Sequence, residues 1–212
     1  AASDLVGWLK SKNEKQKASA ASKAQKKVKT GYLLRLCAEL KMPTIIETID
    51  RHLETCDRKL VVFAYHKSVL KALSMRYARI SVSLHGGTPK KKRQSNVDQF
   101  QKDPNTRLFF GQLKAAGSGI TLTSASDWLC CEWWWVPAIL VQAEDRIHRI
   151  GQKNAAHCTY LTAINTVEED LAQMTERKQG IINNIIDGND VEDTFDVYTE
   201  FVKAIRKRHG TN

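Results

Sequence analysis

The sequence predicts an α/β domain built on a mostly parallel β-sheet. Short, continuously apolar runs alternate along the chain with longer segments whose apolar residues recur at helical spacing. Continuous apolar runs are typical of strands buried on both faces. Hydrophobic residues make up 42% of the 212 residues, which predicts a packed core rather than a disordered chain. In such a sheet, the loops that follow the strand ends carry the function.

The first elements are a helical region, a strand, a helix and a second strand. Apolar residues from Leu33 to Leu53 suit helical faces, with an interruption near Pro43. Residues 59–64 form the first predicted strand. Residues 68–77 then read as a helix, and residues 79–84 as the second strand. The apolar residues expected on the inner face of that helix are Val69, Leu70, Leu73 and Met75.

The middle of the chain continues the alternation. Thr88 followed by Pro89 predicts a helix start, with Thr as the N-cap residue, and the helix should run to about Gln101. Residues 107–110 and 128–132 are the third and fourth predicted strands. The order of elements therefore remains strand, helix, strand.

The last part of the globular region contains two helices and a strand. Pro137 should open a helix that Gly151 closes at its C′ position. Residues 157–163 are the fifth predicted strand. A capping-box pattern at residues 166–169 starts a long helix to about Ile186, with Glu168, Glu169 and Asp170 as its acidic first turn.

Composition divides the chain into three regions. Residues 1–32 hold eight lysines and two acidic residues and predict a basic arm, helical or partly disordered. Residues 33–188 form the globular domain. Residues 189–212 predict an acidic and then basic helical tail.

Charge indicates a polyanionic partner. The formal net charge is +10 and the pI is about 9.4, values that favour nucleic acid. Besides the N-terminal arm, basic residues cluster at 90–93 and at 203–208. One such cluster is compatible with an ordinary solvated face, but three in one chain favour a nucleic-acid partner.

The five cysteines indicate neither a disulfide framework nor a zinc site, because their number is odd and no Cys-x-x-Cys occurs. We therefore expect small buried hydrophobic side chains and no metal site. The apolar runs are too short to cross a bilayer, and no secretory leader is apparent. A reducing location is expected: cytoplasmic in a bacterium or phage system, or alternatively nuclear.

The helix predicted from Pro137 to Ile150 carries the most specific pattern. Gln142, Arg146 and Arg149 are spaced by four and three residues, which places them on one side of a helix. Two guanidinium groups on one face suit a chain of phosphates. An amphipathic helix with surface arginines is the simpler alternative.

The stretch from Gln142 to Gln152 resembles helicase motif VI of the Swi/Snf family, a branch of helicase superfamily two. The resemblance implies a RecA-like three-layer domain flanked by helical N- and C-terminal additions. It also implies that Arg146 and Arg149 are arginine fingers for ATP, that Gln142 couples nucleotide binding to lobe closure, and that Asp145 lies in the nucleotide-linked set.

Three further segments resemble motifs of the same family, closest to its annealing-helicase (HARP-like) branch and microbial relatives. Residues 60–66 resemble motif IV, 84–88 a strand with a glycine turn, and 114–122 motif V. Glycines allow the backbone to approach a phosphate, and helix N-termini donate amides. The residues that the resemblance assigns to DNA are His66, Lys67, Gly86, Gly87, Thr88, Arg93, Lys114 and Thr121. Gly117 and Gly119 are assigned to a loop that links DNA to the nucleotide.

Two departures from the family pattern stand out. Gln112 and Leu113 occupy positions before the motif V lysine where the family has Ser or Thr, so a hydroxyl contact to DNA is not expected there. Residues 133–135 are three consecutive tryptophans where the family has usually one. Because they follow a buried strand, we expect a core or lobe-interface role rather than base stacking.

The sequence holds no Gly-x-x-x-x-Gly-Lys-Ser/Thr phosphate loop. The resemblance therefore implies that ATP and Mg²⁺ are bound mainly by a first, N-terminal RecA-like lobe, and that this chain alone hydrolyses no ATP. The expected partners are that lobe and double-stranded or forked DNA. A non-catalytic DNA- or protein-binding module is the alternative. A nuclease or polymerase lacks support, since no paired-carboxylate metal cluster is apparent.

Overall fold

The structure, a computed structural model, describes residues 31–116, 119–152, 154–186, 200–201 and 203–204. The chain divides into two compact units, Ala1–Leu36 and Cys37–Asn212. The second unit holds the sheet and every functional candidate discussed below. Most of the predicted basic arm and of the predicted tail lies outside the described residues, so the proposed boundaries at 32 and 188 stay predictions.

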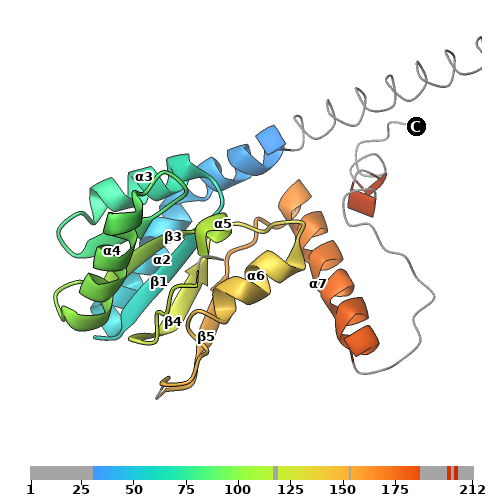
Figure 1. The fold of residues 1–212 in the computed structure, drawn as a ribbon. Helices are drawn as coiled ribbons and strands as arrows, with labels where there is room; N and C mark the ends of the chain where they lie inside the picture. The colour runs from blue at the N-terminus through green and yellow to red at the C-terminus, as the bar shows by residue number, and fades with distance from the viewer. Residues whose placement is uncertain (1–30, 117–118, 153, 187–199, 202, 205–212) are drawn as a thin grey trace, which may run out of the picture. The chain divides into compact units, whose positions relative to one another are not determined.

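The second unit alternates strands and helices along the chain (Figure 1). The strands are β1 (Lys59–Ala64), β2 (Ser81–Leu84), β3 (Leu108–Gln112), β4 (Ala125–Cys130) and β5 (His157–Tyr160). The helices are α2 (Met42–Thr55), α3 (Lys67–Arg76), α4 (Lys90–Lys102), α5 (Leu113–Ala116), α6 (Pro137–Glu144) and α7 (Val167–Ile186).

The sheet is parallel throughout, in the order β2-β3-β1-β4-β5. Ala64 pairs with Gln112, Phe63 with Cys130, and Leu84 with Gly111. The carboxyl ends of these strands therefore meet at one edge of the sheet, which we call the carboxyl edge. Loops that are distant in sequence start side by side there.

Helices cover both faces of the sheet and make a three-layer domain, which confirms the predicted RecA-like class. One face packs on α2 and α3, through a core that includes Ile45, Ile49, Leu70 and Leu73 against Val62 of β1. On the opposite face, α4 contributes Phe100, whose ring lies 5.3 Å from that of Phe109. Burial of these aromatic and aliphatic side chains is the main force that assembles the layers.

The central strand was predicted well and the outer limits of others less well. β1 has the predicted bounds, whereas β4 begins at Ala125, three residues early; its pairing with β1 shifts register between Lys59 and Leu60, opposite the buried polar residue Ser126. β5 ends at Tyr160 rather than 163. Met75, predicted to face inward, is 70% exposed. The short α5 was not predicted.

The helix expected over residues 137–150 ends at Glu144. The chain continues in irregular turns, in which the carbonyl oxygen of Arg146 accepts a hydrogen bond from the amide of Leu122 at 2.8 Å. Gly151 adopts a φ of 104°, as expected of a C′ glycine, but it lies well beyond the end of the helix. The predicted single helical face for Gln142, Arg146 and Arg149 is therefore wrong.

The two predicted helix starts differ in outcome. At α4 the Thr88 hydroxyl does not cap the helix; it accepts the amide of His85 at 3.0 Å. At α7 the Thr166 hydroxyl accepts the amide of Glu168 at 3.1 Å, as an N-cap residue should. The returning bond of the capping box goes from the amide of Asn165 to Glu169.

Candidate functional site

The loops after β1, β2, β3 and β4 are tied together at the carboxyl edge by side chains. Gln112, the last residue of β3, reaches both neighbouring loops. Its Oε1 accepts the amide of Gly86 at 3.0 Å, and its Nε2 donates to the carbonyl oxygen of Tyr65 at 3.1 Å. The residue that departs from the family pattern therefore joins the loop after β1 to the loop after β2. Sequence reasoning missed this role.

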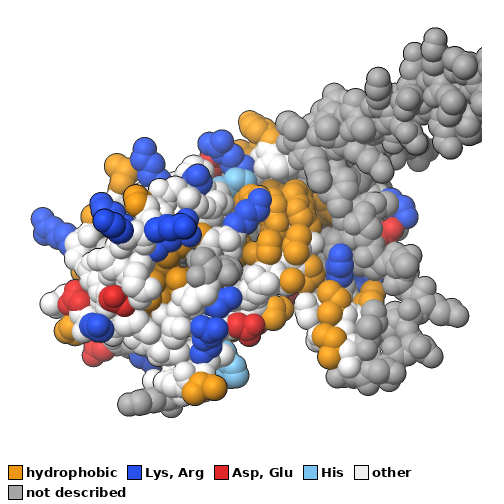
Figure 2. Space-filling model, viewed as in Figure 1, with side chains coloured by type: hydrophobic (Ala, Val, Ile, Leu, Met, Phe, Trp, Pro, Cys, Tyr) orange, Lys and Arg blue, Asp and Glu red, His pale blue; other side chains and the backbone are white. Residues whose placement is uncertain are grey.

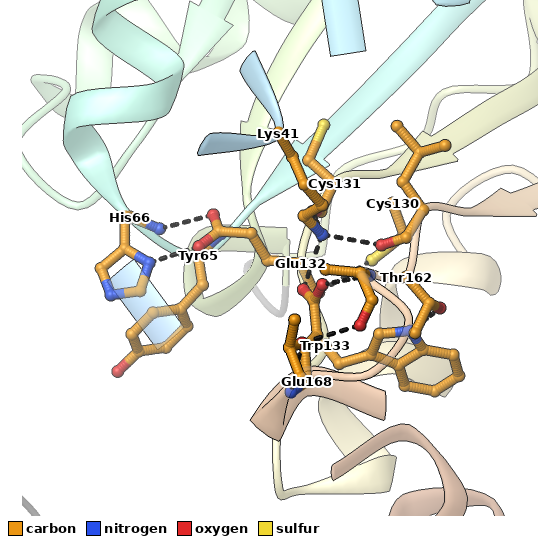
Figure 3. A network of polar contacts seen from close by, with 12 residues as sticks. Lys41, Tyr65, His66, Cys130, Cys131, Glu132, Trp133, Thr162 and Glu168 are labelled. Atoms are coloured by element: carbon orange, nitrogen blue, oxygen red, sulfur yellow. Dashed lines mark hydrogen bonds and ion pairs between the residues drawn. The ribbon is translucent and has the colours of Figure 1, made fainter. Parts of the chain in front are cut away.

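Glu132, just beyond β4, holds the loop after β1 from the other side (Figure 3). Its Oε2 accepts the amides of Tyr65, at 2.7 Å, and of His66, at 3.0 Å. Its Oε1 contacts Nδ1 of His66. Glu132 is only 3% exposed, so this carboxylate is satisfied by the protein rather than by water. His66 is thereby fixed at the start of α3.

The glycine turn after β2 is ordered by local hydrogen bonds. The amide of Gly87 donates to Nδ1 of His85 at 3.1 Å. Arg93 donates from Nε to the carbonyl oxygen of Thr88 at 2.9 Å and from its terminal nitrogen to that of Gly86 at 3.3 Å. Gly86 and Gly87 are exposed, while Thr88 is buried. The turn presents backbone to solvent, and Arg93 is half-buried beneath it.

Aromatic side chains line the same edge. The rings of Tyr65 and Trp134 stack, and the ammonium of Lys114 lies 5.0 Å and 5.7 Å from their centroids. Trp133 donates to the hydroxyl of Thr162 at 2.7 Å (Figure 3). Trp133 and Trp134 are each 8% exposed, which matches the expected core role. Lys114 remains exposed.

A buried ion pair lies behind this edge (Figure 3). The Lys41 ammonium donates to Glu168 at 2.6 Å, to the carbonyl oxygen of Cys131 at 2.6 Å and to that of Leu161 at 2.8 Å. The second oxygen of Glu168 accepts the amide of Ala163 at 2.8 Å. All three ammonium protons are used. The contact fixes the exits of β4 and β5 and the start of α7, and no local sequence pattern indicates it.

The segment after α6 places the two arginines differently. Arg149 is exposed and donates to the hydroxyl of Thr121, at 3.1 Å. Arg146 is half-buried, and its Nε has no hydrogen-bond partner within the described part of the chain. Gln152 anchors the segment, since its Nε2 donates to the carbonyl oxygen of Ala125 at 2.6 Å. Arg149 can therefore present its remaining donors to a ligand.

An open hollow of about 510 Å³ lies beside this segment, lined by Thr121, His148, Arg149 and Ile150. Gln142 and Asp145 are exposed. Gly119 has a φ of 73°, and a Cβ there would meet no atom within 4 Å, so its backbone is open to a close approach. Gly117, assigned with it, lies outside the described residues.

Burial makes two cysteines poor nucleophiles or metal ligands. It raises the pKa of the Cys130 thiol to about 12 and that of Cys131 well above its usual range. Within the described residues, no group of three or more His, Cys, Asp or Glu side chains could hold a metal ion. The helices that the structure describes are also too short or too polar to cross a membrane.

The profile of the helicase conserved C-terminal domain matches residues 41–151, which contain β1 to β4 and the segment after α6. The chain belongs to this helicase family. A relative, the DNA annealing helicase and endonuclease ZRANB3 of Mus musculus, is 35% identical over 74% of this chain. A Caenorhabditis elegans homolog of the SWI/SNF-related matrix-associated actin-dependent regulator of chromatin subfamily A-like protein 1 is 36% identical over 66%.

The helicase C-terminal lobe also has a solved structural neighbour, the C-terminal part of the Fun30 ATPase domain. The two align with a TM-score of 0.57 and 29% identity, over 60% of this chain and 44% of that one. Together these similarities confirm the predicted resemblance to the C-terminal lobe of Swi/Snf-family proteins. The chain spans only 15% of the mouse relative and 21% of the nematode relative.

Within this helicase lobe, the structure gathers most of the assigned DNA residues at the carboxyl edge. His66, Lys67, Gly86, Gly87 and Lys114 belong to loops or helix starts that Gln112 and Glu132 hold together. Thr121 lies apart from them, in contact with Arg149. The residues that organise the site are thus Gln112, Glu132, Lys41 and Glu168, which the motif comparison did not assign.

Proposed function

We propose that this chain is the second RecA-like lobe of an ATP-driven double-stranded-DNA translocase. In this proposal the carboxyl edge faces duplex or forked DNA, and the segment after α6 faces ATP held by a first lobe. The DNA-facing residues are His66, Lys67, Gly86, Gly87, Thr88, Arg93, Lys114 and Thr121. The nucleotide-facing residues are Arg146 and Arg149, with Gln142, Asp145, Gly117 and Gly119 linked to them.

The contact between Arg149 and Thr121 carries the proposal. Thr121 belongs to the loop that resembles motif V, and Arg149 to the stretch that resembles motif VI. A hydrogen bond of 3.1 Å between an always-charged guanidinium and a hydroxyl joins the segment expected at the nucleotide to the loop expected at DNA. A change at one ligand can therefore alter the geometry offered to the other.

Arg149, which lines the hollow, and Arg146, three residues before it, are the guanidinium groups that we assign to a nucleotide polyphosphate. Arg149 is exposed with donors to spare, and the buried Nε of Arg146 lacks a partner among the described residues. Two guanidinium groups can stabilise the charge of a phosphoryl group during transfer. Because the sequence holds no Gly-x-x-x-x-Gly-Lys-Ser/Thr phosphate loop, we place ATP and Mg²⁺ mainly on the first lobe. When bound, that pair supplies the phosphoryl group and its counter-charge.

The named relatives support the DNA partner. One is called a DNA annealing helicase and another a regulator of chromatin. These names favour a nuclear setting over a bacterial or phage one. The positive net charge and the exposed glycine turn at the carboxyl edge agree with a phosphate-backbone ligand.

The test replaces Arg149 in the intact protein. Arg149→Ala should reduce DNA-stimulated ATP hydrolysis by about 10³-fold or more, as loss of an arginine finger does, while duplex binding stays within about twofold. Arg149→Lys should rescue little, because an ammonium cannot reproduce the guanidinium fork. Steady-state phosphate release and fluorescence anisotropy with a labelled duplex measure the two properties.

Arg51→Ala is the matched control, because Arg51 is an exposed arginine that forms an ion pair with Glu47 on α2. It should leave both measurements unchanged. Unaltered hydrolysis in Arg149→Ala would refute the finger role. A protein that binds duplex but hydrolyses no ATP in any form would instead support the non-catalytic binding module.

A further inference from the structure

A groove between α3 and the outer strand β2 lies next to the carboxyl edge; it shares Lys67 with the function proposed above, which gives its other lining residues no role. Its volume is about 430 Å³. The lining includes Lys67, Lys71, Ser74, Met75, Ser83 and His85. Because β2 is an edge strand of the sheet, the groove opens away from the sheet centre. We call it the α3–β2 groove.

The charge of the α3–β2 groove is positive and not neutralised. Lys67 and Lys71 are both exposed and lie one helical turn apart on α3. None of the described residues that line the groove carries a carboxylate, and neither lysine forms an ion pair with a described residue. Figure 2 shows further Lys and Arg side chains over α3 and α4. The groove therefore attracts an anion.

The groove continues the carboxyl edge. His85 is both a lining residue and the first residue of the glycine turn, where its Nδ1 accepts the amide of Gly87 at 3.1 Å. Lys67 is both a lining residue and the neighbour of His66, which Glu132 fixes. An extended polyanion that crosses the turn at Gly86 would enter the groove without a gap.

The spacing and the floor also suit a nucleic-acid backbone. Residues four apart on a helix are separated by about 6 Å along its axis, so the ammonium groups of Lys67 and Lys71, on flexible stems, can reach neighbouring phosphates of one DNA strand. Met75 is 70% exposed beside these lysines, and the lysine stems add further apolar surface. Sugars can pack on this floor while the ammonium groups and the hydroxyls of Ser74 and Ser83 face phosphate oxygens.

We infer that the α3–β2 groove is a second binding site for the phosphate backbone, which extends the DNA track past Lys67 to Lys71. The inference rests on the proposed DNA partner and deepens it. Lys71 acts on the backbone without sequence preference, so it contributes to affinity and to its salt dependence rather than to specificity. An acidic polypeptide, the other polyanion to consider, would not need the continuity with the glycine turn.

Salt-dependent binding of the full chain to a labelled random-sequence duplex tests the inference. A contact to one phosphate contributes about 0.9 to the slope of log K against log salt concentration, equivalent to about eightfold in affinity at 0.1 M salt. Lys71→Ala should therefore bind about eightfold more weakly and lower the slope by about 1. Lys71→Arg, which keeps the charge, should restore both values.

Lys102→Ala is the matched control. Lys102 is also an exposed helical lysine, but it ends α4, on the way back to the amino end of β3. It should leave the affinity and slope unchanged, which separates a local contact from the general effect of one lost charge. Thermal unfolding curves of all variants should coincide with that of the wild type, because Lys71 is an exposed side chain.

Each outcome decides between the proposals. No duplex binding by the wild type would overturn both the proposed DNA partner and this inference. Wild-type binding with an unchanged slope in Lys71→Ala would overturn the inference alone. The inference also fails if the wild type and Lys71→Ala bind the duplex with equal affinity, while polyglutamate displaces the duplex from the wild type and does not displace it from Lys71→Ala. The groove would then be a site for acidic polypeptides.

Discussion

The carboxylate of Glu132 accepts the backbone amide of Tyr65 at 2.7 Å and thereby binds the exit of β4 to the exit of β1. The two strands are neighbours in the sheet, paired through Phe63 and Cys130. A buried acidic side chain fixes the path of a loop whose exposed neighbour, Lys67, faces solvent. The shape of the carboxyl edge therefore depends on a residue behind it.

Replacement of Glu132 should destabilise the lobe. Glu132→Ala removes the acceptor of two amides, and we expect a loss of about 2–5 kcal/mol in the free energy of unfolding, because buried donors would be left unpaired. Glu132→Gln keeps one acceptor oxygen and should lose less. Urea denaturation measures both. The control Glu47→Ala removes an exposed carboxylate and should cost under about 0.5 kcal/mol; equal costs at the two sites would contradict the assignment.

The ion pair of Lys41 and Glu168 should show strong coupling. Lys41→Met leaves a buried carboxylate without its cation and should cost about 3–5 kcal/mol. Glu168→Gln keeps an acceptor for the amide of Ala163 but leaves the ammonium unpaired. The double variant should be less destabilised than the sum of the two single variants. A double-mutant cycle in urea tests this, and strictly additive costs would show that the pair is not coupled.

Two glycines should respond in opposite directions to an added methyl group. A Cβ at Gly111, in β3, would lie 2.6 Å from Cε1 of Phe63, a fully buried ring. Gly111→Ala should therefore lose about 1–3 kcal/mol in unfolding free energy. A Cβ at Gly180, in α7, meets nothing within 4 Å, so Gly180→Ala should gain about 0.5–1 kcal/mol. Thermal unfolding should move Tm down in the first and up in the second.

Tyr77 should make stability depend on alkaline pH. Burial and the hydrogen bond from its hydroxyl to Asp50, at 2.7 Å, raise the pKa of Tyr77 from about 10 to about 12. Because the folded-state pKa lies above the unfolded value, the neutral phenol stabilises the fold below pH 10. That contribution is lost as pH rises through 12.

Tyr77→Phe isolates this effect, since every other titrating group is common to both proteins. The difference in unfolding free energy between wild type and variant should be constant below pH 10 and should shrink between pH 10 and 12. Urea titrations across this range measure it. A difference that does not change with pH would mean that the phenol titrates alike in the folded and unfolded chains.

The strands could be predicted from the sequence where burial requires a continuous run of apolar residues. The run at 60–64 is apolar throughout because β1 is central and buried. The start of β4 has no such run, since its buried Asp127 is a charged residue that pairs with Arg58 from outside the strand. The segment that follows α6 likewise contacts a separate part of the chain, since the carbonyl oxygen of Arg146 accepts the amide of Leu122. Contacts between separate segments set these limits, and local periodicity does not record them.

The exposed residues of the candidate site could be predicted from the sequence, but the buried residues that hold its loops in place could not. Motif resemblance assigned His66, the glycine turn and Arg149, because each of them lies within a short, continuous sequence motif. Lys41 and Glu168 are separated by 127 positions, so their pairing has no signature in either segment. From the sequence, Gln112 stood out only as a departure from the family's motif V pattern. The structure shows that its two hydrogen bonds join the loop after β1 to the loop after β2.

The buried ammonium of Lys41 has a consequence for how such lobes can be exchanged between proteins. It lies just before α2, yet its carboxylate partner opens α7. A crossover between two parental genes anywhere between these positions would combine an ammonium from one parent with whatever the other parent carries at its α7. A hybrid is therefore certain to inherit a matched pair only when the breakpoints fall outside both residues. Recombination that preserves the ion pair should therefore transfer residues 41 to 168 together as one segment.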